Sequence, residues 1–202
     1  VMTDFHLHDG FSHFLVLDNG FTPRQAGRIA QRLVEIETYR VMALLAFPVA
    51  KDVGRLVSRA EDELADLMDG MGQSRSAEDD RAVLVRLSRL AAEVERSVAR
   101  TTFRFGAAGA YYRLVRQRID DLREQRLPGF SPIGEFMDRR LVPAIDTCTS
   151  IARRQDDLSG RVARNSQLLR TRVDVEIERQ NQELLAQMNR RAKIQLHLQE
   201  TG

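Results

Sequence analysis

Four side chains near the N-terminus are the residues in this chain that most resemble a metal site: Asp4, His6, His8 and His13. Imidazole nitrogens and carboxylate oxygens are common Zn²⁺ ligands. His6 and His8 would share one face of a β-strand, and His13 could lie across a hairpin from them. The spacing matches no His-Glu-x-x-His motif, and no cysteine pair accompanies it. We therefore expect polar surface side chains here and no metal ion.

A second candidate is the carboxylate of Glu37, in the stretch Glu35-Ile36-Glu37-Thr38-Tyr39-Arg40. On a helix, Glu37 would lie between two valines, which predicts partial burial. A buried carboxylate needs a cationic partner. A general base would also need a cleft and a second titrating group, and the sequence places neither. We therefore expect a structural ion pair between Glu37 and one of three arginines: Arg40, Arg104 or Arg113.

The remaining candidates for catalysis lack the surroundings that catalysis needs. Serines, threonines and the lone Cys148 have no nucleophile-elbow sequence around them. Gly106 and Gly109 lie among alanines and not in a phosphate-binding loop, so we expect them to permit close contact with another helix. The sequence predicts no enzyme and no cofactor.

Composition narrows the class of protein further. Aromatic residues are 6% of the chain and tryptophan is absent, which favours helices over a β-sandwich or barrel. The chain has 31 Lys and Arg against 29 Asp and Glu, and the acids are interleaved with the arginines, so we do not expect nucleic-acid binding. No apolar run approaches the length of a membrane span.

The order of the elements predicts a mainly α-helical protein. Residues 1–20 alternate in polarity around Asp9-Gly10, which predicts a β-hairpin. A two-stranded hairpin is marginally stable by itself, so we expect it to belong to a sheet whose other strands lie upstream. Residues 21–130 predict a bundle of long antiparallel helices. Thr22 and Gln25 would form a capping box, Pro48 would interrupt the first helix, a loop would begin at Gly70, and Ser76 would cap the next helix.

Two apolar stripes indicate how these helices pack. The clearest seam has steps of three and four residues and comprises Leu84, Leu87, Ala91, Val94 and Val98. The pattern of residues 131–202 predicts one very long helix that bends at Pro143. Its stripe comprises Leu158, Val162, Leu169, Val173, Ile177, Leu184 and Met188. Two interpretations remain open: a bundle helix with an imperfect core face, or an oligomeric stalk.

Several stretches resemble one family. They are Glu35 to Arg40 with Met42-Ala43-Leu44-Leu45, Ala91 to Glu95, Ala110-Tyr111-Tyr112, Leu168 to Asp174, Gln180-Asn181, Met188 to Ala192 and Gln195 to Gln199. Together they resemble the domain of unknown function 3422 (DUF3422), a family of predicted membrane-anchored proteobacterial proteins. The resemblance implies an α/β region upstream and membrane helices downstream, and it implies no catalytic residues.

Two functional hypotheses follow from the residues and the resemblance. The first is a helical structural or interaction protein that forms homo-oligomers on the cytoplasmic side of the bacterial inner membrane. The basic residues Arg190, Arg191 and Lys193 agree with that side of a membrane. The alternative is the stalk of a divalent cation transporter similar in layout to CorA channels. Asp120-Asp121 or Asp156-Asp157 could then bind Mg²⁺, although nothing else in the sequence supports this.

Overall fold

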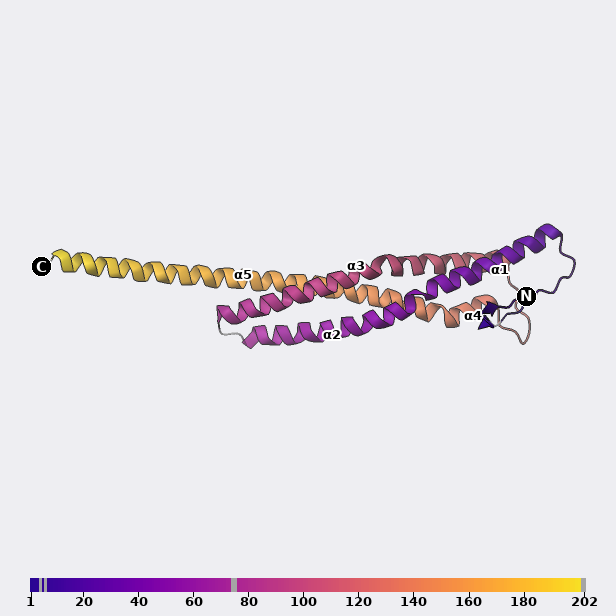
Figure 1. The fold of residues 1–202 in the computed structure, drawn as a ribbon, viewed down its shortest axis with the longest axis horizontal. Helices are drawn as coiled ribbons and strands as arrows, with labels where there is room; N and C mark the ends of the chain where they lie inside the picture. Colours follow the sequence, from indigo (N-terminus) through magenta and orange to yellow (C-terminus); the bar gives the residue numbers. More distant parts are fainter. Residues whose placement is uncertain (4, 6, 74–75, 201–202) are drawn as a thin grey trace. The chain divides into compact units, whose positions relative to one another are not determined.

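The computed structural model describes residues 1–3, 5, 7–73 and 76–200 and is mainly α-helical, as the sequence predicted (Figure 1). The elements are β1 (Leu7–His8), β2 (Phe11–Ser12), α1 (Pro23–Leu44), α2 (Ala46–Gln73), α3 (Ala77–Leu122), α4 (Ile133–Arg140) and α5 (Val142–Glu200). The helices form two compact units. The first contains Val1–Leu56 and Ser97–Arg154, and the second contains Val57–Arg96 and Gln155–Gly202.

The predicted hairpin is present, with shorter strands than its sequence pattern indicated. β1 pairs antiparallel with β2, and one further bridge joins Met2 to Leu15. Asp9 and Gly10 connect the strands with φ of 54° and 85°. This is the left-handed conformation that a two-residue hairpin turn requires and that glycine adopts without strain.

Both helix breaks near prolines occur before the proline itself. α1 ends at Leu44, so the interruption expected at Pro48 falls at Leu45. Proline has no N–H and its ring clashes with the carbonyl four residues earlier, which is that of Leu44. In the same way α4 ends at Arg140 and α5 begins at Val142, just before Pro143. The single helix expected from Ser131 is therefore two helices, and only the second is very long.

α4 receives its N-terminal cap from a distant residue. Pro132 occupies the cap position and makes no side-chain cap hydrogen bond. Glu124 accepts hydrogen bonds from the backbone N–H groups of Ile133 at 2.6 Å and Gly134 at 2.9 Å. A carboxylate at this end satisfies free donors and complements the helix dipole.

The core of the first unit combines Phe5 of the N-terminal segment with α1, the start of α2, the second half of α3, α4 and the start of α5. Its fully buried members include Ile36, Ala50, Val115 and Met137. Gly54 of α2 lies against α5, where an added Cβ would be 3.2 Å from Cδ1 of Ile151. A larger residue at Gly54 would have to displace that side chain.

The second unit packs α2, α3 and α5 along three apolar seams. The buried side chains are Val57, Ala60, Leu64, Leu67, Leu87, Leu90, Val94, Leu158, Val162, Leu169 and Val173. On α3 the predicted seam was partly wrong. Leu87 and Val94 are buried, whereas Leu84, Ala91 and Val98 are only partly buried, and Leu90 takes their place. α3 contacts both α2 and α5. The side of α3 that is buried therefore differs from the side that apolar spacing alone predicts.

The end of α2 also differs from the prediction. Gly70 and Gly72 are helical, and α2 continues to Gln73, whereas a loop was expected from Gly70. Arg172 of α5 donates from Nη1 to the Met71 carbonyl at 3.3 Å. This bond satisfies one of the carbonyls that the last turn of a helix leaves free. Ser74 lies outside the described residues.

Candidate functional site

Glu37 and Arg40 form a two-pronged ion pair on one face of α1. Arg40 donates from Nε to Glu37 Oε2 and from Nη2 to Oε1, both at 2.7 Å. The side chains are 14% and 15% exposed, respectively. Parallel bonds from a guanidinium to a carboxylate are among the strongest hydrogen bonds in proteins.

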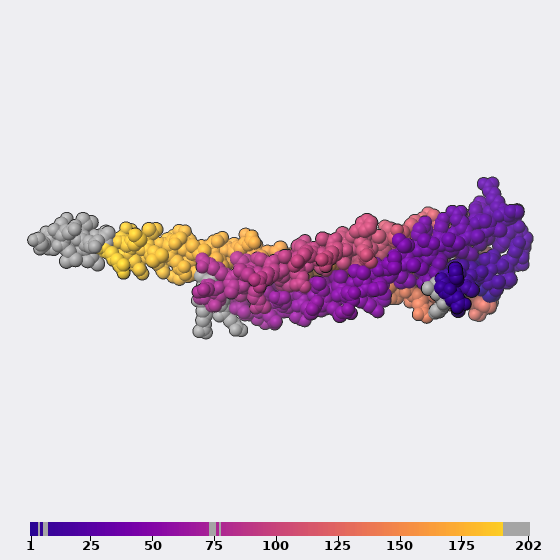
Figure 2. Space-filling view, viewed as in Figure 1, coloured from indigo at the N-terminus to yellow at the C-terminus, as the bar shows by residue number. Residues whose placement is uncertain are grey.

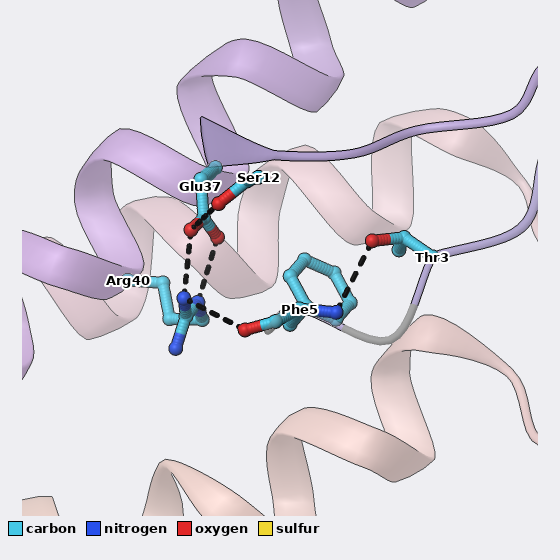
Figure 3. A network of polar contacts seen from close by, with 5 residues as sticks. All are labelled: Thr3, Phe5, Ser12, Glu37 and Arg40. Atoms are coloured by element: carbon cyan, nitrogen blue, oxygen red, sulfur yellow. Dashed lines mark hydrogen bonds and ion pairs between the residues drawn. The ribbon is translucent and has the colours of Figure 1, made fainter. Parts of the chain in front are cut away.

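The N-terminal segment covers this pair (Figure 3). Ser12 of β2 donates to Glu37 Oε1 at 2.6 Å. Arg40 lies over the ring of Phe5, 5.5 Å from its centroid, and Nη2 donates to the Phe5 carbonyl at 3.4 Å. The Phe5 ring stacks on Phe136 of α4 at 5.0 Å. We call Ser12, Glu37, Arg40 and Phe5 the Glu37 cluster. It fastens the hairpin to α1 and α4.

The electrostatics of the cluster hold Glu37 ionised. Burial raises the pKa of Glu37, but hydrogen bonds from Arg40 and Ser12 outweigh that effect, so the pKa lies below its ordinary value. Both carboxylate oxygens already accept hydrogen bonds. A general base needs a free oxygen facing a substrate, so this geometry favours a structural role.

The other predicted partners of Glu37 lie elsewhere. Arg104 and Arg113 are exposed on α3. Gly106 has no described atom within 4 Å of an added Cβ, and at Gly109 only Nη1 of Arg113 comes within that distance, at 3.8 Å. The close helix contact expected at these two glycines is therefore not made among the described residues. A described glycine that does lie close to another helix is Gly54, 3.2 Å from Ile151 by its added Cβ, and the sequence analysis did not single it out.

A charged chain beside the Glu37 cluster joins α1 to α3. Arg118 donates from Nε to Glu35, and its Nη1 lies 3.5 Å from Asp121, which in turn lies 3.8 Å from Nε of Arg32. Hydrogen bonds from Gln31 and Arg118 lower the pKa of Glu35. The carboxylate pair Asp120-Asp121, considered for Mg²⁺, therefore has Asp121 engaged by two arginines.

His8 and His13 line an open groove of about 1130 Å³. His8 and His13 meet edge to face with their ring centroids 5.5 Å apart. Asp4 and His6, the other two members of the candidate metal cluster, lie outside the described residues. In the described part of the chain no three His, Cys, Asp or Glu side chains are grouped to hold a metal ion.

A buried carboxylate that the sequence analysis did not pick out lies in the second unit. Asp80 in the first turn of α3 has a side chain only 5% exposed, and Arg172 Nε of α5 lies 3.0 Å from its Oδ2. The sequence placed Asp80 in a run of acids that suits a helix N-terminus and gave no sign of its burial. Its cation comes from α5, far along the chain.

The sequence model of the family described as "Protein of unknown function (DUF3422)" matches residues 1–202, which is the whole chain. The chain belongs to the DUF3422 family. No curated protein and no solved structure matches it. Family membership therefore confirms the resemblance seen in the sequence and assigns no activity.

In this DUF3422 chain several apolar side chains of α5 are exposed between residues 174 and 191. Leu184, Leu185 and Met188 are 57%, 60% and 66% exposed, and Val175 is 65% exposed. They lie beyond Val173, the last buried residue of the α5 stripe among the side chains that are described, which reach Arg191. On the face shown in Figure 2, no other element covers this segment (yellow). Among the described helices, none is long and apolar enough to cross a membrane.

Proposed function

We propose that this chain is a helical structural protein that associates with itself, and that residues 174–191 of α5 form the contact. The exposure of Leu184 and Met188 carries the proposal. The same stripe is buried against α2 and α3 from Leu158 to Val173 and then continues without a cover. Helices in proteins gain most of their stability from packing an apolar face against other elements. A second helix would supply that packing.

Hydrophobic transfer gives the association its driving force. Fully burying a leucine or methionine side chain contributes about 2 kcal/mol, so a few such side chains from each copy amount to several kcal/mol before the entropy cost of association. Polar residues on the stripe limit this gain. A weak, concentration-dependent oligomer is the expected result.

Membrane attachment and a place on the cytoplasmic side of a bacterial inner membrane remain part of the proposal, supported by the family resemblance and by the basic pair Arg190 and Arg191. The cation-transport alternative has less support. Asp121 is occupied by arginines, and Asp156 and Asp157 are exposed on α5.

Charged substitutions on the stripe test the proposal. The double variant L184E M188E places carboxylates where the contact should form, and V85E F103E makes the same change at exposed apolar residues of α3. Light scattering should show a lower molar mass for the first variant only. Loss of association in the α3 variant alone would contradict the proposed surface.

A further inference from the structure

We propose that an exposed face of α3 in the first unit binds the surface of an anionic phospholipid membrane. Arg100, Phe103, Arg104 and Arg113 form this face, which we call the Phe103 face. The proposal does not depend on self-association through α5. It adds a lipid contact in the first unit to the membrane attachment proposed near the end of α5.

The two units carry charge of opposite sign. The first holds 17 Lys and Arg against 12 Asp and Glu, whereas the second holds 14 against 17. Residues 97–119 of α3 contain five arginines and no acid, which equals the entire positive excess of the first unit. An anionic surface that approached this part of α3 would therefore meet no carboxylate on the helix.

Three of these five arginines are available to an external anion. The other two form ion pairs with acids of other helices. Arg100, Arg104 and Arg113 are exposed and pair with no acid among the residues that the structure describes. The sequence had offered Arg104 and Arg113 as partners of Glu37, which pairs with Arg40 instead.

Phe103 places a large apolar ring among these charges. It is 87% exposed, the highest value among the large apolar side chains of the described residues. Arg100 precedes it by three positions and therefore lies beside it on the helix surface. Arg104 follows Arg100 by four positions, so the two guanidinium groups lie on one row.

Arg113 borders the same face from the other direction along α3. Its Nη1 lies 3.8 Å from the Cβ position that a side chain at Gly109 would have, so the arginine reaches back toward Phe103. At Gly106, between them, an added Cβ would meet no described atom within 4 Å. The helix surface beside the ring is therefore open to a flat partner.

A ring bordered by guanidinium groups on a convex helix suits a lipid interface. The arginines can extend to the phosphates while the ring enters between the headgroups. A DNA duplex would bind the arginines but would leave the ring without a stacking partner, because stacking uses unpaired bases. Each arginine near an anionic surface strengthens binding about fivefold, so three give about a hundredfold. The expected contact is weak and sensitive to salt.

The variant F103W reports on this contact directly, because the unmodified sequence contains no tryptophan. The full chain would be titrated with vesicles of phosphatidylcholine alone and with vesicles that contain about one third phosphatidylglycerol. The emission should move to shorter wavelength with the anionic vesicles only, and brominated lipids should quench it. V85W, at an exposed position of α3 in the second unit, should show neither effect.

Removal of charge tests the role of the arginines. In the F103W background, R100Q R104Q should lower the partition coefficient about 25-fold. R24Q R28Q is the matched control, because it removes two charges at the same spacing from exposed positions of α1 in the same unit. Salt screens distant charges, so the control should lower the coefficient about twofold at most. Equal losses in the two variants would show a response to net charge and would overturn the proposal.

Three other outcomes would also overturn it. Vesicle binding without an emission shift, lost in R190Q R191Q, would place the contact at the end of α5 and support the attachment proposed there. A DNA duplex that shifted the emission at lower concentration than the vesicles would indicate nucleic-acid binding by this face. An unchanged emission with every vesicle would show that Phe103 does not enter lipid. None of these results bears on self-association, which is measured without vesicles.

Discussion

Nε of Arg172 in α5 lies 3.0 Å from Oδ2 of Asp80 in α3. The Asp80 carboxylate is almost completely buried. Oδ1 of Asp80 has no hydrogen-bond partner among the described residues. The carboxylate therefore depends on Arg172 for its compensation. An ionised group that is left buried and unpaired destabilises the folded protein. Loss of this contact should therefore lower the free energy of unfolding.

Replacing Arg172 by alanine should destabilise the protein. R172A leaves Asp80 without its cation and the Met71 carbonyl without a donor, and we expect a loss of about 2 kcal/mol in the free energy of unfolding. The exposed Arg170 provides the control, because R170A removes the same side chain from the same helix. Urea titration measures both. Equal stability of the two variants would contradict the role given to Arg172.

Replacing Glu37 by glutamine should also lower stability. Gln keeps the shape of the side chain but loses the charge that strengthens the two bonds from Arg40, so we expect a loss of about 2 kcal/mol. E93Q, at an exposed position of α3, is the matched control. Thermal unfolding followed by circular dichroism compares them. If E37Q unfolded at the temperature of the unmodified protein, the ion pair would have no structural importance.

The contribution of Glu37 should depend on pH in one direction. Its pKa is lowered in the folded protein from 4.5, so folding favours the ionised form. The stability it adds is present above the unfolded pKa and is lost as the pH falls through the folded value. The difference between the unmodified protein and E37Q should therefore be constant near neutral pH and shrink below about 4.5. A difference that grew on acidification would show the opposite pKa shift.

Glu124 should stabilise α4 through its backbone contacts. E124A frees the N–H groups of Ile133 and Gly134, and a lost helix cap costs about 1 kcal/mol. E124Q keeps one acceptor oxygen and should lose less. Hydrogen exchange of the amides in α4 measures the effect locally. Unchanged protection in E124A would show that packing against the core holds this helix without the cap.

Local sequence signals were sufficient for the caps of α1 and α3 and for the hairpin turn. Thr22 and Gln25 form the predicted capping box, and Ser76 accepts from Asp79 N–H at 3.1 Å. These contacts join residues three positions apart, and residue type alone specifies them. Glu37 likewise pairs with Arg40, which is the candidate partner nearest to it in sequence and lies on the same helix.

Long-range contacts could not be predicted in this way. Glu37 was expected to be buried because two valines flank it, yet Val34 and Val41 are 63% and 43% exposed, and the cover comes from Ser12 and Phe5. Asp80 and Gly54 owe their surroundings to α5, about a hundred residues later in the chain. Only the folded arrangement of the helices brings these residues together.

The molar mass of the unmodified chain in solution tests the central claim most directly. Self-association through α5 predicts that sedimentation equilibrium will show a mass that rises with concentration from 23.0 kDa toward twice that value, with or without Mg²⁺. A mass of 23.0 kDa at every concentration would contradict the account. A larger ring that forms only with Mg²⁺ would contradict it as well and would support the transporter alternative.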